Sequence, residues 1–229
     1  SPYPDVQIPD VSLTEFLFAD GFADRADAPA IVDGTTGDQL TYTEFHGLVE
    51  KIAGGLAARG IGTGDVVALF APNLPQWAAL FHGILRANGI VTSANSMYTG
   101  GELAHQLKDS GAKMVITVSP FLDRAVAGAK EAGLSEDVVL TIDATEGHDS
   151  LRDLVGSGAP APELTTTATD TAVLPYSSGT TGLAKGVVLT HRNLVANLLQ
   201  IQAMGDVTSE TKIMAFLPFF HIYGMTVMM

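Results

Sequence analysis

The residues with the most chemical potential lie between Tyr176 and Gly186, where the sequence reads YSSGTTGLAKG. This stretch places four Ser and Thr hydroxyls, three glycines and one lysine within eleven residues. Glycine lets backbone N–H groups approach an anion closely. Ser and Thr hydroxyls can donate to phosphate oxygens or coordinate Mg2+, and lysine supplies a mobile positive charge. These residue types in this order indicate a cradle for a triphosphate.

Two other kinds of loop share features of this stretch. A flexible surface loop rich in small residues has a similar composition, so composition alone leaves that interpretation open. A Walker-type phosphate loop would place its lysine directly after a glycine and before Ser or Thr. Here Lys185 follows Ala184 and precedes Gly186. We therefore do not expect a P-loop kinase or GTPase.

The charge balance of the chain narrows the classes of partner. Acidic residues outnumber basic residues by 25 to 12, which gives a net charge of −13. Because nucleic-acid backbones require clustered Lys and Arg, we do not expect a nucleic-acid partner. A phosphate ligand would need a local positive site instead. Lys185 is the only Lys or Arg between Arg152 and Arg192, and it lies within the Gly- and Thr-rich stretch.

The chain has no cysteine, which excludes disulfides and thiolate metal sites. This suits a reducing compartment, and we expect a cytoplasmic protein in which any thiol chemistry comes from a substrate. No apolar run reaches the roughly 18 residues needed to cross a bilayer, so we expect no transmembrane segment. Histidines 46, 82, 105, 148 and 191 lack metal-ligand spacing and are interpreted as surface or packing residues.

The elements that must position the stretch alternate between strand and helix. Thr41 with Glu44, and Thr99 with Glu102, have the spacing of capping boxes, and Pro75 suits the first turn of a helix. Short apolar runs read as buried strands. The expected strands are 66–70, 90–92, 114–118, 138–142, 172–175, 187–189 and 212–216. This order predicts an α/β fold with mostly parallel sheet flanked by helices.

Composition also suggests how the chain is divided. Residues 156–171 are rich in Gly, Ala, Pro and Thr and contain no aromatic residue, which is typical of a surface connection. We therefore expect a first α/β lobe over 1–155 and a connection over 156–171. The phosphate-loop segment and the start of a substrate-pocket region would occupy 172–229, as a domain incomplete at 229.

The stretch 176–186 resembles the phosphate-binding signature of the adenylate-forming, or AMP-binding, superfamily. That group includes acyl- and aryl-CoA ligases, nonribosomal peptide adenylation domains and luciferases. Ala184 departs from the pattern, because the family usually has proline there, and we expect a somewhat looser loop. A second stretch, 217–224 (LPFFHIYG), resembles the next motif of the family. Weaker likenesses along the chain, such as Pro72-Asn73 and the stretch around 95–102, point to 4-coumarate–CoA ligases and acyl-CoA synthetases.

This resemblance implies roles for particular residues. Thr180 would coordinate Mg2+, Lys185 would hold the leaving pyrophosphate, and His221 would gate or orient the substrate carboxylate. Tyr223 and Val227 would line the acyl pocket, although simple packing roles for His221, Tyr223 and Val227 stay open. The residues that would surround the phosphates of ATP are Ser177, Ser178, Gly179, Thr180, Thr181, Gly182 and Lys185.

The resemblance further implies an AMP-forming acid–CoA ligase that uses ATP, Mg2+ and CoA and acts on a carboxylic acid. This chain would supply the ATP phosphate-binding part, and the sequence does not identify the acid. The alternatives are an amino-acid-activating or luciferase-like adenylating enzyme, and a non-catalytic nucleotide-binding or interaction module. The stretch 219–223 favours the ligase.

We expect the 229-residue chain alone to be inactive, because the family's downstream metal-binding motif, ribose-binding aspartate and C-terminal catalytic lysine cannot lie before Met229. Incubation of the purified chain with ATP, a panel of acids and CoA should give no thioester, and turnover would contradict this. The apolar stretch 216–229 is also a candidate surface for self-association, as a dimer or a domain swap.

Overall fold

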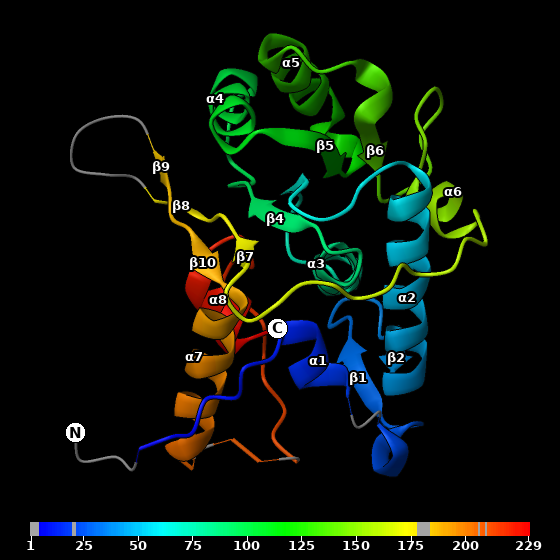
Figure 1. Cartoon of the computed structure of the whole chain (residues 1–229). Helices are drawn as coiled ribbons and strands as arrows, with labels where there is room; N and C mark the ends of the chain where they lie inside the picture. Colours follow the sequence, from blue (N-terminus) through cyan, green and yellow to red (C-terminus); the bar gives the residue numbers. More distant parts are fainter. Residues whose placement is uncertain (1–4, 20–21, 178–183, 206, 209) are drawn as a thin grey trace.

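A six-stranded sheet forms the centre of the protein (Figure 1). The computed structural model describes residues 5–19, 22–177, 184–205, 207–208 and 210–229. The strand order is β10-β7-β4-β3-β5-β6, and all neighbours are parallel except β10, which is antiparallel to β7. The strands are β3 (Val66–Phe70), β4 (Ile90–Ser93), β5 (Ala112–Thr117), β6 (Val139–Thr141), β7 (Thr171–Val173) and β10 (Leu189–Thr190).

Helices cover both faces of this sheet, as β3 shows most clearly. All five β3 residues are buried. Val67 and Leu69 belong to the apolar cluster that includes α2 (Tyr42–Ala58) and α3 (Pro75–Arg86). Val66, Ala68 and Phe70 belong to the cluster with α4 (Gly100–Ser110) and α5 (Leu122–Ala132). Because successive strand residues point to opposite faces, a continuous apolar strand is what a doubly covered sheet requires. The predicted fold class is confirmed.

The predicted helix starts are also present. Thr41 accepts a hydrogen bond from the Glu44 N–H, while the Glu44 carboxylate accepts one from the Thr41 N–H, which is a complete capping box. Thr99 and Glu102 form the same arrangement at the start of α4. Pro75 occupies the first turn of α3. Glu102 is therefore accounted for as a cap, and its bonds with Thr99 lower the pKa of the carboxyl.

Smaller elements complete the described chain. β1 (Pro29–Val32) and β2 (Gln39–Thr41) form an antiparallel hairpin, and β8 (Tyr176–Ser177) and β9 (Lys185–Gly186) form a two-stranded ribbon. The remaining helices are α1 (Leu13–Phe18), α6 (Leu151–Val155), α7 (His191–Ala203) and α8 (Ile222–Val227), with short 3-10 turns at Ala23–Arg25, Ser119–Phe121 and Glu136–Val138. No helix in the described ranges is long and apolar enough to span a membrane.

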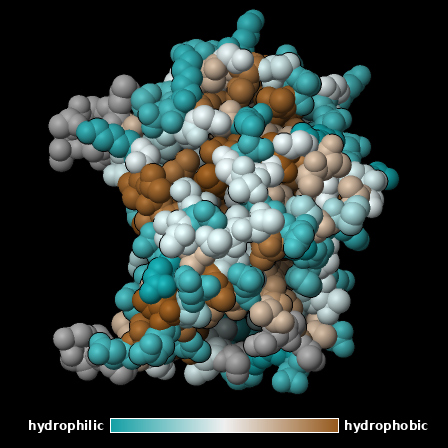
Figure 2. Space-filling view, viewed as in Figure 1, coloured by the Kyte–Doolittle hydropathy of each residue, from teal (hydrophilic) through white to brown (hydrophobic). Residues whose placement is uncertain are grey.

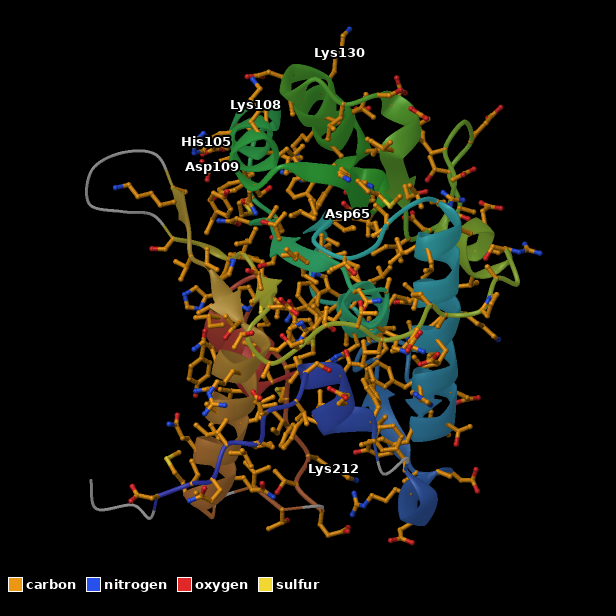
Figure 3. The ribbon with its side chains drawn as sticks, viewed as in Figure 1. Asp65, His105, Lys108, Asp109, Lys130 and Lys212 are labelled. Atoms are coloured by element: carbon orange, nitrogen blue, oxygen red, sulfur yellow. The ribbon has the colours of Figure 1, made fainter. Side chains whose placement is uncertain are left out.

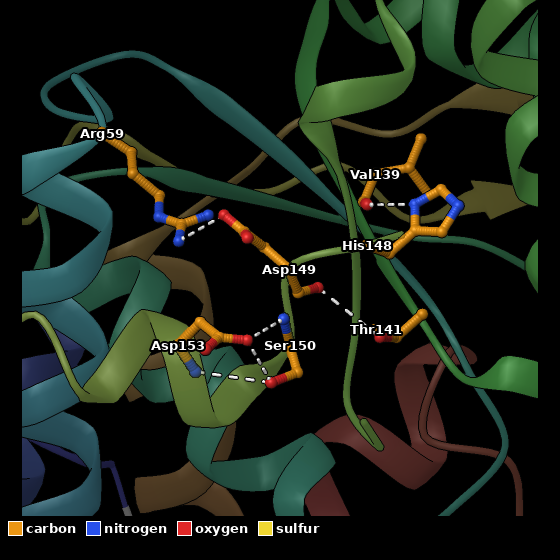
Figure 4. Close-up of polar contacts among 7 residues, drawn as sticks. All are labelled: Arg59, Val139, Thr141, His148, Asp149, Ser150 and Asp153. Atoms are coloured by element: carbon orange, nitrogen blue, oxygen red, sulfur yellow. Dashed lines mark hydrogen bonds and ion pairs between the residues drawn. The ribbon is translucent and has the colours of Figure 1, made fainter. Parts of the chain in front are cut away.

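The outer edge of β6 is covered by the segment that follows it (Figure 4). The Thr141 N–H donates to the Asp149 carbonyl at 2.9 Å, and the Asp149 carboxylate pairs with Arg59 at 2.8 Å. Ser150 then caps α6 through a reciprocal box with Asp153. These contacts fasten the segment to both β6 and the end of α2, so this edge of the sheet is not left open for pairing with another chain.

The predicted connection at 156–171 runs between strands of one sheet. Residues 156–170 contain no helix or strand, and β7 then pairs with β4. Asn88 fixes part of this run, because its carboxamide oxygen accepts from the Thr165 and Thr166 N–H groups. The strands on either side of 156–171 thus share the central sheet. The division into a first lobe and a later part stays a prediction.

Two expected strands differ in the structure. Residues 212–216, predicted as a strand, have no strand conformation. No strand of the described chain pairs with this run, and Met214 and Phe216 are 81% and 70% exposed. The run 187–189 is split, since Val187 and Val188 lie between β9 and β10. Figure 2 shows apolar surface at the left edge of the molecule, where Figure 1 draws β8 and β10. Self-association through 216–229 stays a prediction.

A buried imidazole packs against α1 among aromatic rings. His82 lies against the rings of Phe18, Phe45 and Phe81, with centroids 5.2 to 5.9 Å apart. Its Nδ1 is buried without a hydrogen-bond partner among the described residues. Burial penalises the charged ring and lowers the pKa of His82 to about 4.

This burial predicts a pH-dependent stability. Between pH 6.5 and 4 the unfolded chain binds a proton on residue 82 that the folded chain does not, so the free energy of unfolding falls as the pH is lowered through this window. The loss is on the order of 3 kcal/mol across the window. Urea unfolding from pH 7 to pH 4 measures it. His82→Phe should reduce the slope, whereas His221→Gln at an exposed ring should not. Equal slopes for wild type and His82→Phe would contradict the assignment.

Candidate functional site

The β8–β9 ribbon brings together two of the predicted phosphate-binding residues. Ser177 lies directly opposite Lys185, and Tyr176 lies opposite Gly186. Opposed residues of an antiparallel pair project from the same face, and successive residues alternate. The Ser177 hydroxyl and the Lys185 ammonium group therefore share one face. Ser178, Gly179, Thr180, Thr181 and Gly182 lie outside the described residues.

The other face of the ribbon is held by α4. The Tyr176 phenol donates to Asp109 Oδ2 at 2.6 Å, and His105 Nε2 lies 3.1 Å from the Ala184 carbonyl oxygen. Burial and the bond to Asp109 raise the pKa of Tyr176. A Cβ at position 186 would lie 3.1 Å from the Tyr176 ring, so a side chain there would displace the ring by a few tenths of an ångström. Figure 3 labels His105 and Asp109 on the side of α4 turned toward β8 and β9.

The end of β4 fastens both predicted motifs to the sheet. Thr92 Oγ1 donates to the Leu174 carbonyl at 2.8 Å, just before the ribbon. Ser93 Oγ donates to the Phe220 carbonyl at 2.8 Å, just before His221. The buried amide of Gln106, on α4, donates to both Thr92 Oγ1 and the Ser93 carbonyl. This network compensates for sparse strand pairing, since β4 and β7 share only the Val91–Val173 register pair.

Asn73 holds the segment that leads to His221. Its Nδ2 donates to the carbonyls of Ala215 and Leu217 at 3.0 and 2.8 Å. Its Oδ1 accepts from the Phe219 N–H at 2.8 Å. The Phe219 ring is buried, with its centroid 5.4 Å from that of Trp77. In the sequence, Pro72-Asn73 is only a weak likeness to the family, whereas the structure shows that Asn73 positions the segment before His221.

His221 lies at the start of α8. Its Nδ1 accepts a hydrogen bond from the Tyr223 N–H at 3.3 Å, so the ring serves as an N-cap. In a neutral ring with Nδ1 as acceptor, Nε2 carries the proton and can donate. Gly224 permits the tight turn into this helix, because a Cβ there would lie 2.2 Å from the Pro218 carbonyl oxygen.

One cavity connects the two motifs. It has a volume of about 500 Å³, and both Ser177 and His221 line it. Its other walls come from the ends of β4 and β7 and from the start of α8, with Ser93, Asn95, Tyr98, Pro175, Tyr176, Val187, Leu189, Phe220 and Ile222. Hydroxyl, amide and imidazole groups therefore converge on a space large enough for a small ligand.

A second cavity of about 590 Å³ adjoins His221 on the side of α7. Tyr223 and Val227, the predicted pocket residues, line it together with His221. The α7 side is mostly apolar, although Asn193 and Asn197 also reach it. Tyr223 is 51% exposed, so its ring is not fully packed in the core. The mostly apolar lining suits the apolar part of a small ligand, and His221 lines both cavities.

The remaining histidines do not assemble a metal site. Among the described residues there is no group of three or more His, Asp and Glu side chains that could hold a metal ion. His191 is the first residue of α7 and is buried, and its Nδ1 accepts from the Leu13 N–H at 3.1 Å. Its role is therefore to join α1 to α7. The predicted magnesium ligand, Thr180, lies outside the described ranges.

The chain belongs to the AMP-binding enzyme family, whose sequence profile matches residues 18–229. It is 37% identical to a 4-coumarate–CoA ligase of Pinus taeda and 34% identical to 4-coumarate–CoA ligase 3 of Oryza sativa subsp. japonica, over 98% of this chain in each case. It covers 42% and 41% of those proteins, so the chain spans about two fifths of the length of these relatives.

Solved structures agree with this membership. The chain is similar to ATP-bound MatB of Rhodopseudomonas palustris, with a TM-score of 0.78 and 30% identity, over 96% of this chain and 42% of that one. It is also similar to the N-terminal domain of FACL13 of Mycobacterium tuberculosis, with a TM-score of 0.82 and 26% identity, over 94% and 53% of the two chains. The resemblance inferred from residues 176–186 and 217–224 is confirmed.

The contacts of Asn73 predict how the second motif depends on it. Asn73→Asp keeps an acceptor for the Phe219 N–H but loses both donor bonds, and Asn73→Leu loses all three. Each lost bond should cost on the order of 1 kcal/mol of local stability. Amide hydrogen exchange across 215–221 should therefore accelerate in the order wild type, Asp, Leu. A control with the same amide-to-carboxyl change at an exposed residue of β2, Gln39→Glu, should leave that exchange unaltered. Equal protection in Asn73→Leu would show that packing of Phe219 suffices.

Proposed function

We propose that this chain supplies the ATP phosphate-binding part of an AMP-forming carboxylic acid–CoA ligase. One observation carries the proposal: Ser177 stands opposite Lys185 on one face of the ribbon, and Ser177 shares a cavity with His221. A hydroxyl and an ammonium group suit phosphate oxygens, and an imidazole N–H donor suits a carboxylate. The names of the 4-coumarate–CoA ligase relatives support CoA ligation as the overall reaction. Cytoplasmic placement, expected from the lack of cysteine, is part of this proposal.

The first proposed step joins the acid to AMP. A carboxylate oxygen attacks the α-phosphorus of ATP, the bond from that phosphorus to the bridging oxygen of pyrophosphate breaks, and pyrophosphate leaves with the electron pair. Two anions must approach each other, so the site has to neutralise charge and hold the line of attack. Lys185 would pair with the departing phosphates, and Ser177 would donate to them. His221 would orient the carboxylate through Nε2–H.

The second proposed step forms the thioester. The CoA thiol releases its proton to solvent, its sulfur attacks the acyl carbonyl carbon, the bond from that carbon to the AMP oxygen breaks, and AMP leaves with the electron pair. The second cavity, with Tyr223 and Val227, would hold the acyl body throughout. Bound Mg2+ would supply further charge neutralisation on the phosphates, with Thr180 as its proposed protein ligand. Ser178, Gly179, Thr181 and Gly182 would complete the cradle by hydroxyl and backbone donors.

Removal of the Lys185 ammonium group tests the proposal directly. In the full-length enzyme, Lys185→Ala should lower the rate of ATP–pyrophosphate exchange about 100-fold or more, because charge stabilisation in the transition state is lost. Folding should be little changed, since Lys185 is exposed and its removal leaves no buried group unpaired. The exchange assay, run with a panel of carboxylic acids, and a thermal melt measure the two effects.

The control is Lys212→Ala. Lys212 is exposed and lies at the opposite end of the molecule from α4 (Figure 3). This variant makes the same change of charge and should keep wild-type exchange. A folded Lys185→Ala enzyme with full activity would refute the role of Lys185. ATP binding by the wild type without pyrophosphate release for any acid would favour a non-catalytic nucleotide-binding module. Exchange with amino acids but no thioester would favour an amino-acid-activating enzyme.

A further inference from the structure

We propose that Asp109 and His105 of α4 are positioning residues that set which face of the β8–β9 ribbon meets ATP. This inference rests on the proposed function, and it assigns a part to a helix that carries none of the predicted phosphate ligands. Asp109 bonds to Tyr176 of β8, and His105 contacts the carbonyl oxygen of Ala184, the residue just before β9. The ribbon is thereby held at the two points where the chain enters and leaves the phosphate loop.

The spacing of the two residues on α4 makes this grip possible. Residues four apart lie one turn above each other on the same helix face. His105 and Asp109 have this spacing, and Figure 3 shows both on the side toward β9. The helix itself is rigid, because its Leu103, Ala104 and Leu107 side chains are buried in the core. A fixed helix face therefore carries both contacts.

Asp109 is poorly suited to its place in α4 by local rules. It is the second-last residue of the helix, where the partial negative charge of the C-terminus disfavours a carboxylate by about 0.3–1 kcal/mol. It also adds negative charge close to a loop proposed to bind a polyanion. A residue that conflicts with its local surroundings calls for a tertiary reason. The 2.6 Å bond from the Tyr176 phenol supplies one, because bonds to an ionised acceptor are short and strong.

Because of the ribbon's geometry, the bond between Tyr176 and Asp109 also determines the direction in which Ser177 and Lys185 project. With Tyr176 drawn toward α4, its cross-strand neighbour Gly186 lies under the ring. The next pair, Ser177 and Lys185, must then project from the opposite face. If the phenol lost its partner, the ribbon could rotate about its long axis, and the two phosphate-binding side chains would lose their common direction.

The test separates the two half-reactions in the full-length enzyme. Asp109→Ala and Tyr176→Phe should each lower kcat/KM for ATP–pyrophosphate exchange about 10-fold, since misplaced groups lose transition-state contacts. Thioester formation from a synthetic acyl-adenylate and CoA should stay within about twofold of wild type, because no triphosphate is bound in that step. The double variant should lose no more than either single variant, since both remove one shared bond.

Two further variants distinguish positioning from general destabilisation. Asp109→Asn keeps an oxygen acceptor for the phenol and should recover most of the exchange activity. Glu131→Ala removes an exposed carboxylate from the neighbouring helix α5 and should behave as wild type. Unchanged exchange in Asp109→Ala and Tyr176→Phe, or an equal loss of both half-reactions, would overturn the inference. A wild-type enzyme without any exchange would instead refute the proposed function.

Discussion

The site depends on the last two residues of β4, Thr92 and Ser93, whose side-chain hydroxyls bond to segments elsewhere in the chain. Thr92 and Ser93 bond to carbonyls of two segments that are more than forty residues apart, Leu174 and Phe220. Burying a hydroxyl or a carbonyl group without a hydrogen-bond partner costs free energy. Each of these bonds therefore satisfies both of the groups that it joins. One strand end thereby fixes the distance between the ribbon that carries Lys185 and the turn that carries His221. Gln106 ties the same point to α4.

Local patterns in the sequence were sufficient for the elements that define the fold. The capping boxes at Thr41 and Thr99 and the apolar run of β3 each follow from interactions within a few residues or from complete burial. The run 212–216 has a strand-like apolar pattern, but no strand of the described chain pairs with it. Strand formation depends on a partner that periodicity cannot reveal, so this prediction was wrong.

The candidate site could be predicted only in part, for a related reason. Ser177 and Lys185 were identified by residue type, because hydroxyl, glycine and lysine are intrinsically suited to phosphate. Asn73 bonds to Phe219, which is 146 residues away in the sequence. Asp109 bonds to Tyr176, which is 67 residues away. The residues next to Asn73 and Asp109 do not identify these partners. An asparagine after a strand resembles a turn residue, and an aspartate in the last turn of a helix is locally unfavourable but does not reveal that Tyr176 is its partner.

The close fit of Tyr176 against Gly186 has a consequence for how this loop can change in length. A slip of one residue in a two-stranded ribbon exchanges its faces. A side chain at 186 would crowd the aromatic ring at 3.1 to 3.2 Å, so glycine at this position favours the register in which Tyr176 lies opposite residue 186. Insertions or deletions between the two strands can therefore alter the reach of the loop while the Ser177–Lys185 pair keeps its direction. Exchange of this loop among related enzymes should be tolerated as long as the aromatic ring and the glycine beneath it are retained together.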